Sequence, residues 1–235
     1  MAKRPDQQST HLPAQGDTAI RLEHALKDLA LLATPAQRQT LLHYLQQLLH
    51  WNKTYNLTAI RNPDHALTHH LFDSLSVVAP ILNAHDRLKA TPLRIMDVGS
   101  GGGLPGIILA IMLPTAEITC LDAVEKKTTF IRQMVSVLSL QNLQVMHARV
   151  ETIEPQNNTI VISRAFASLQ EFAQLASHHV VATGYLLAMK GKPPTDEILA
   201  LNAETLWQTH TVESLTVPEL DAQRCLVWMQ RKGIE

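Results

Sequence analysis

The sequence has few cysteines, few aromatic residues and no long hydrophobic run. Its 235 residues include only Cys120 and Cys225, which lie far apart and outside any C-x-x-C pair. This pattern excludes a disulfide framework and a cysteine-based zinc cluster. The longest apolar run, Ile107 to Leu113, is far shorter than the roughly 20 residues that span a bilayer, and residues 1–17 lack the apolar region of a signal peptide. We therefore expect a cytoplasmic protein without a membrane anchor.

The chain also lacks an excess of charge of either sign. It has 20 Lys and Arg against 21 Asp and Glu, so the formal net charge is -1. Any nucleic-acid partner must therefore be held by a local patch. Four cations are candidates for RNA contact: Lys53, Arg61, Lys190 and Lys192. Each alone is equally well explained as a solvated charge. Together with Trp51 and Tyr55, which can stack on an exposed base, they favour a nucleic-acid surface.

The sequence divides into three segments. Residues 1–17 are polar and predict a flexible tail. Residues 18–90 predict a helical cap, because Thr34-Pro35-Ala36-Gln37 is a capping box ahead of a leucine stripe, and Asn62-Pro63 starts a further helix that runs to about Val78. Residues 91–235 form the main domain.

From Pro92 onward, short β-rich runs alternate with helical stretches, among them Lys126 to Leu140 and Leu169 to Ala182. Such alternation predicts an α/β fold with a mostly parallel sheet covered on both faces. The last two strands, Thr209 to Val217 and Arg224 to Arg231, are joined by a connection too short for a helix. We therefore expect the final strand to enter antiparallel.

A glycine-rich loop lies in the stretch IMDVGSGGGLPGI, Ile95 to Ile107, between a predicted strand and a predicted helix. Gly101-x-Gly103-x-x-Gly106 satisfies the dinucleotide-binding fingerprint, and Asp122 follows Gly101 by 21 residues, where a ribose-binding carboxylate belongs. On this pattern alone, a dinucleotide-dependent dehydrogenase is admissible.

Asp97, two residues before Gly99, separates two interpretations of the loop. A carboxylate at the mouth of the loop repels a pyrophosphate and attracts a cation. S-adenosylmethionine carries a sulfonium and an ammonium group and no phosphate, and its ribose still suits Asp122. Bare backbone at Gly99, Gly101 and Gly103 lets such a ligand approach closely. The spacing therefore favours a class I methyltransferase over a dinucleotide-binding enzyme.

Five ordered motifs carry a family resemblance: WNKTYNLTAIR (51–61), HHLFDS (69–74), GSGGGLPG (99–106), ISRAFAS (162–168) and AMKG (188–191). With them the chain resembles, from about Thr34 to its C-terminus, the bacterial small-subunit ribosomal RNA guanine-N7 methyltransferases, the glucose-inhibited division protein B family. One position departs from the family, which often has arginine where this chain has His69. A cationic role at that position would depend on pH.

The resemblance implies a Rossmann-like, seven-stranded methyltransferase sheet with an N-terminal helical cap. It also implies that S-adenosylmethionine methylates N7 of a guanine in a functional loop of 16S rRNA, so the partner is that RNA or the small ribosomal subunit. The donor-binding positions that carry over are Gly99, Leu104, Val150, Glu151 and Arg164.

Guanine N7 is an unprotonated acceptor, so direct methyl transfer requires no dedicated general base and no covalent intermediate. The enzyme has only to position the base and accommodate the resulting cation. Arg164 and Lys190 are the positioning candidates, although Arg164 is also compatible with an ordinary salt bridge.

Other chemistries are weaker matches. The two cysteines lie in apolar strands and are expected in the core, not as nucleophiles. His65, His69 and Asp73 have a spacing compatible with a metal, but they lack further ligand residues, and we expect no metal. We also expect a monomer. A non-catalytic RNA-binding protein with a methyltransferase fold remains open, although the intact glycine loop is evidence against it.

Overall fold

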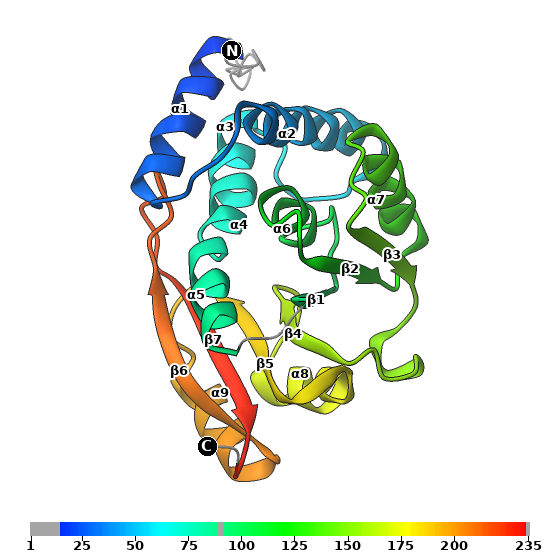
Figure 1. Cartoon of the computed structure of the whole chain (residues 1–235), viewed down its shortest axis with the longest axis vertical. Helices are drawn as coiled ribbons and strands as arrows, with labels where there is room; N and C mark the ends of the chain where they lie inside the picture. Colours follow the sequence, from blue (N-terminus) through cyan, green and yellow to red (C-terminus); the bar gives the residue numbers. More distant parts are fainter. Residues whose placement is uncertain (1–14, 89–91, 234–235) are drawn as a thin grey trace, which may run out of the picture.

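The computed structural model describes residues 15–88 and 92–233, and it begins with a layer of helices (Figure 1). They are α1 (Gln15–Asp28), α2 (Pro35–Tyr55), α3 (Pro63–Ala66), the π-helical segment η1 (Leu67–Phe72), α4 (Asp73–Leu75) and α5 (Val78–Leu88). The predicted capping box is confirmed, because Thr34 and Gln37 satisfy each other's backbone amides at the start of α2. The helix expected from Pro63 is interrupted by η1, whose wider turn is typical of functional sites.

The expected tail and its boundaries are only partly described. Helix α1 already begins at Gln15, inside the segment predicted to be a flexible tail over residues 1–17. Residues 1–14 and the boundary between cap and main domain at residues 89–91 lie outside the described residues.

A seven-stranded sheet follows, in the order β3-β2-β1-β4-β5-β7-β6. Its strands are β1 (Arg94–Val98), β2 (Glu117–Asp122), β3 (Leu143–His147), β4 (Asn158–Ser163), β5 (Val180–Lys190), β6 (Trp207–Leu215) and β7 (Arg224–Arg231). Strands β1 to β5 are parallel, and β7 is antiparallel to both β5 and β6. The predicted mostly parallel sheet with an antiparallel last strand is therefore confirmed.

The helices of the main domain cover both faces of the sheet (Figure 1). They are α6 (Gly106–Met112), α7 (Glu125–Val137), α8 (Leu169–Ala176) and α9 (Thr195–Glu204), with short 3-10 turns at Val150–Thr152 and Ser177–His179. The helix predicted over Leu169 to Ala182 was too long, because Val180 already pairs with Asn158 of β4 as the first residue of β5. Two β-branched residues, Val180 and Val181, favour the strand there.

Two apolar clusters lie on opposite faces of the sheet. Alternate residues of β1 divide between them, with Ile95 in one cluster and Met96 in the other. The cluster that contains Ile95 also contains leucines of α1, α2 and η1, including Leu22, Leu48 and Leu67. The N-terminal helices therefore share one continuous core with the sheet, and this packing fixes them over the glycine loop.

Candidate methyltransferase site

A cleft of about 440 Å³ opens where β1, β4 and β5 end. Ligands of open α/β sheets bind at this edge, outside the carboxyl ends of the strands. The glycine loop, the N-terminal helices, the residues after β4 and β5, and the start of β7 all contribute. The lining residues are Leu48, Leu57, Thr58, Ile60, His69, His70, Asp73, Gly99, Ser100, Gly101, Gly102, Leu104, Arg164, Ala165, Met189, Lys190, Gly191 and Arg224.

The glycine loop has a backbone that larger residues adopt poorly. Gly99, Gly101 and Gly103 have φ values of 72°, 58° and 86°. A Cβ on Gly99 would lie 2.6 Å from the Cβ of Ala165, and one on Gly103 would lie 2.4 Å from Cδ1 of Ile107. Gly99 and Gly101 line the cleft, whereas Gly103 packs against α6 and is outside the lining. The loop therefore needs glycine for its backbone conformation and for close packing against its neighbours.

Asp97 lies below the loop and not at its mouth, which corrects the position expected from the sequence. Its side chain is fully buried, and Oδ2 accepts a hydrogen bond of 2.9 Å from the amide of Gly106, near the start of α6. The other oxygen, Oδ1, is buried without a hydrogen-bond partner among the described residues. Burial raises the pKa of Asp97 to about 7, although the Gly106 amide and the Arg164 charge oppose this shift. The buried carboxylate therefore favours a nearby cation electrostatically.

Asp122 closes the loop from the end of β2. Its Oδ2 accepts a hydrogen bond of 2.9 Å from the amide of Gly101, and its Oδ1 accepts one of 2.9 Å from Val124. Lys127 lies 3.6 Å from Oδ2. Asp122 is only 4% exposed and is not among the cleft-lining residues. Its predicted contact with a ribose is therefore untested, and in this structure it holds the loop.

Tyr44 supports the same loop from the N-terminal helices, a role that the sequence interpretation missed. The fully buried Tyr44 of α2 donates a hydrogen bond of 2.6 Å from Oη to the carbonyl of Gly102. One turn further along α2, Leu48 lines the cleft. Leu48 belongs to the predicted leucine stripe, whereas Tyr44 lies on the same buried face of α2 and was not included in that stripe. Its position three residues after Leu41 was the available signal.

Val150 and Glu151, the predicted positions after β3, form a 3-10 turn outside the cleft lining. Buried His179 donates a hydrogen bond of 2.9 Å from Nε2 to the carbonyl of Val150. A hydrogen bond to its own backbone amide and a second from Arg149 lower the pKa of Glu151. The turn is therefore held in place with an acceptor side chain exposed beside it.

An ion triad closes the opposite side of the cleft. Asp73, the first residue of α4, is 5% exposed, and its two oxygens lie 3.0 Å from Nη1 of Arg164 and 2.9 Å from Nε of Arg224. The ordinary salt bridge considered for Arg164 is thus present. Arg224 was missed, although the antiparallel entry of β7 carries its first residue to this edge, beside the Lys190–Cys225 pair of β5 and β7.

The four cations proposed for RNA differ in their surroundings. Lys190 lines the cleft, but its Nζ lies 2.8 Å from Oε2 of Glu197 and 3.4 Å from the carbonyl oxygen of Phe166. The ammonium group of Lys190 therefore stabilises the loop after β4 and is not a freely exposed charge. Lys53, Arg61 and Lys192 are exposed, and none has a salt-bridge partner within the described residues.

The imidazoles of the cleft lie on η1. His70 is buried, its Nε2 lies 2.8 Å from Oγ1 of Thr58, and burial lowers its pKa to about 4. His69 lines the cleft from the same segment, with its ring 5.8 Å from that of His65.

Over residues 15–88 and 92–233, the structure has no cluster of three or more His, Cys, Asp or Glu residues that could bind a metal ion.

Comparison with known proteins establishes the family. The family model described as rRNA small subunit methyltransferase G matches residues 37–227. The chain belongs to this family. A member from Bordetella avium (strain 197N) is 54% identical over 221 residues, which cover 94% of this chain and 96% of that protein. A member from Methylibium petroleiphilum (strain PM1) is 44% identical over 212 residues, which cover 90% of this chain and 94% of that protein.

Solved structures agree with the methyltransferase fold of the family. The ribosomal protein L11 methylase of Lactobacillus delbrueckii subsp. bulgaricus has a TM-score of 0.51 and 13% identity, covering 69% of this chain and 77% of that one. TrmN of Thermus thermophilus also has a TM-score of 0.51 and 13% identity, covering 70% of this chain and 53% of that one. At this identity the likeness extends to the fold alone. No described helix of this family member has the length and apolar character that a membrane span requires.

Proposed function

We propose that this chain transfers the methyl group of S-adenosylmethionine to N7 of a guanine in small-subunit ribosomal RNA. One observation carries the proposal. The cleft combines a bare glycine backbone over a buried carboxylate on one side with two guanidinium groups on the other. Family membership supplies the reaction class, and the names of the relatives supply the substrate class.

The residues present fit the methyl donor. Gly99 presents bare backbone to the cleft, and Gly103 packs too closely against Ile107 to carry a side chain. Oδ1 of Asp97 is a buried acceptor without a protein partner among the described residues. Arg164 suits the carboxylate of the methionine part, and Val150 with Glu151 suits the adenine. When bound, S-adenosylmethionine supplies an electrophilic methyl group. The protein groups bind it and exclude water.

The side of the cleft formed by Asp73, its two arginines and the imidazoles of η1 is the acceptor side. It favours methylation of a nucleobase nitrogen that carries no hydrogen. Asp73 is engaged with two arginines. The pKa of His70 is lowered to about 4, so His70 is a poor proton acceptor at neutral pH. Guanine N7 has a free lone pair, which matches a site of this kind. The remaining work is to hold the unstacked base in line with the methyl group, with Arg164 and Lys190 as positioning candidates.

The test is transfer of a labelled methyl group by the purified chain into deproteinised small-subunit rRNA and into intact small subunits. We expect incorporation at one guanine, detected by strand cleavage specific for N7-methylguanine. Saturable binding of NAD without methyl transfer would instead support the dinucleotide alternative. Tight RNA binding without turnover would support a non-catalytic RNA-binding protein.

A further inference from the structure

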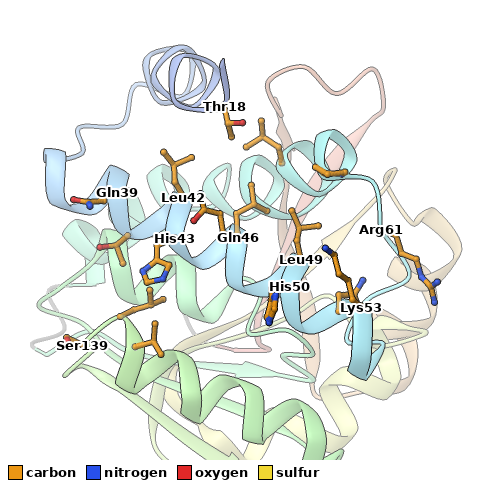
Figure 2. Close-up of a pocket in the computed structure, with 17 residues that line it drawn as sticks. Thr18, Gln39, Leu42, His43, Gln46, Leu49, His50, Lys53, Arg61 and Ser139 are labelled. Carbon is orange, nitrogen blue, oxygen red and sulfur yellow. The ribbon is translucent and has the colours of Figure 1, made fainter. Parts of the chain in front are cut away.

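A second hollow, larger than the cleft, lies along the outer face of α2 (Figure 2). We call it the α2 groove. It has a volume of about 1010 Å³ and is bordered by α1 through Thr18 and by the turn after α7 through Ser139. The lining residues are Thr18, Gln39, Thr40, Leu42, His43, Leu45, Gln46, Leu49, His50, Asn52, Lys53, Arg61, Pro63, Leu67, Val137, Leu138 and Ser139. The site described above does not account for it.

The charge of the α2 groove differs from that of the whole chain. Acidic residues slightly outnumber basic ones over the full sequence, yet no Asp or Glu is among the described residues that line the groove. Its charged or titratable members are Lys53, Arg61, His43 and His50. Figure 2 shows Lys53, Arg61 and His50 gathered toward one end, with His43 near the other. A lining with basic and without acidic residues is electrostatically complementary to a polyanion.

The groove and the cleft share no lining residue, but residues adjacent in sequence line the two hollows. Leu48 of α2 lines the cleft, while Leu49 and Lys53 of the same helix line the groove. In the following segment, Ile60 lines the cleft and the adjacent Arg61 lines the groove. A strand leaving the cleft across residues 57–61 would therefore meet Arg61 and Lys53 first.

The apolar part of the lining also suits RNA. Figure 2 shows Leu42 and Leu49 along α2 between the two ends of the groove, and Leu45 of the same helix also lines it. From Leu42 to Lys53, α2 rises about 16 Å, which accommodates a short run of nucleotides. Single-stranded RNA binds through cations that contact its phosphates and through aromatic side chains that stack on its bases. Apolar side chains also pack against unstacked bases.

We propose that the α2 groove holds the single-stranded RNA that flanks the methylated guanine. Lys53 and Arg61 contact its phosphates, and the leucine-lined floor contacts its bases. The inference rests on the proposed function, because it assumes that RNA occupies the cleft. It adds a binding surface on the outer face of a helix whose inner face supports the glycine loop.

The experiment compares K53A/R61A with K27A in the full-length chain. Lys27 is a matched control, because both lysines are exposed in the last turn of a helix and Lys27 lines neither hollow. Binding of deproteinised small-subunit rRNA is measured across a salt series. S-adenosylhomocysteine binding is measured by calorimetry.

We expect K53A/R61A to weaken rRNA binding at least about tenfold and to reduce the salt slope by about 1.4, since each single-strand phosphate contact contributes about 0.7. The affinity of K53A/R61A for S-adenosylhomocysteine should stay within about twofold of that of the unaltered chain. K27A should stay within about twofold for both rRNA and S-adenosylhomocysteine. Equal rRNA affinity in K53A/R61A and K27A would overturn the proposal. Normal binding of naked rRNA together with lost methylation of intact subunits would also overturn it, in favour of a ribosomal protein as the occupant. If the unaltered chain methylates neither substrate, the proposed function fails instead.

Discussion

The two sides of the cleft are built in different ways. The glycine loop depends on residues close in sequence, because Asp97 reaches the Gly106 amide nine positions away and Asp122 reaches Gly101 across one βα unit. The acceptor side depends on Asp73, which bonds to arginines 91 and 151 positions away. A local spacing therefore specifies the two carboxylate contacts of the glycine loop, whereas packing of the whole fold specifies the ion triad around Asp73 and the contact of Tyr44 with the loop.

This difference predicts separable functions. Changes in the loop should affect donor affinity and local stability. Changes at the start of β7 should affect the RNA substrate and leave the donor unaffected.

The Asp97→Asn variant should lose a large pH dependence of stability. Burial raises the folded-state pKa of Asp97 from 3.8 to about 7, so ionisation opposes folding. The unaltered protein should lose stability relative to the variant as pH rises from about 4 to 7, and the difference should level off above pH 7. Three units at about 1.4 kcal/mol each set an upper limit of about 4 kcal/mol.

Urea unfolding of both proteins at pH 4.5, 6 and 8 measures this difference. A constant difference across the three values would show that Asp97 titrates normally in the folded state. The burial argument for the donor side would then be wrong.

The Gly99→Ala variant should lose about 100-fold in affinity for S-adenosylhomocysteine. The left-handed φ of 72° costs a residue with a side chain about 1–2 kcal/mol, and the contact of 2.6 Å with Ala165 adds to that cost. The free loop relieves this strain by leaving its present conformation, so donor binding has to restore it. Calorimetry gives the affinity. Gly191→Ala is the matched control, because Gly191 also lines the cleft but has nothing within 4 Å of an added Cβ. Equal effects of the two changes would remove the special requirement for glycine.

Arg164→Ala and Arg224→Ala should differ in which substrate they affect. We expect Arg164→Ala to raise the KM for the donor about tenfold, the loss of one charged hydrogen bond. Arg224→Ala should instead lower kcat/KM for rRNA about tenfold and leave the donor KM within about twofold. Each variant leaves Asp73 with one arginine, so the structural disturbance is matched. Identical kinetic profiles would show that the triad acts as one structural unit.

The His69→Gln variant should have the smallest effect. Direct attack by N7 releases no proton, so the imidazole has no catalytic proton to accept. We expect kcat to change less than about threefold, with an unchanged pH profile. A loss of about 100-fold with a missing acid limb would identify His69 as a general base.

Much of the fold was predictable from the sequence. The alternation of strand-like and helical segments predicted the parallel sheet, and the short connection before Arg224 predicted the antiparallel strand. The capping box at Thr34 predicted the start of α2. The end of α8 was missed, because apolar residues at the junction of a helix and a buried strand fit both periods. The π segment was missed because no local pattern distinguishes it from an α-helix.

The donor side was predicted better than the acceptor side. Spacing identified the loop and both of its carboxylates, but it did not indicate that Asp97 lies below the loop or that Asp122 bonds to Gly101. Arg224 and Tyr44 were missed because each acts on a distant segment. Their partners can be identified only from the folded structure, in which the sheet order brings β7 beside β5 and the core places α2 over the loop.

The most direct test of the methyltransferase assignment is calorimetric titration of the unaltered chain and Asp97→Asn with S-adenosylhomocysteine at pH 5.5 and 7.5, with NAD as the control ligand. The ammonium group of the ligand favours ionised Asp97, whose pKa is raised to about 7. Affinity should therefore rise with pH in the unaltered chain, remain flat and weaker in Asp97→Asn, and be undetectable for NAD. Binding of NAD, or S-adenosylhomocysteine affinity that is the same in both proteins at both pH values, would contradict a cation-selective donor site built on Asp97.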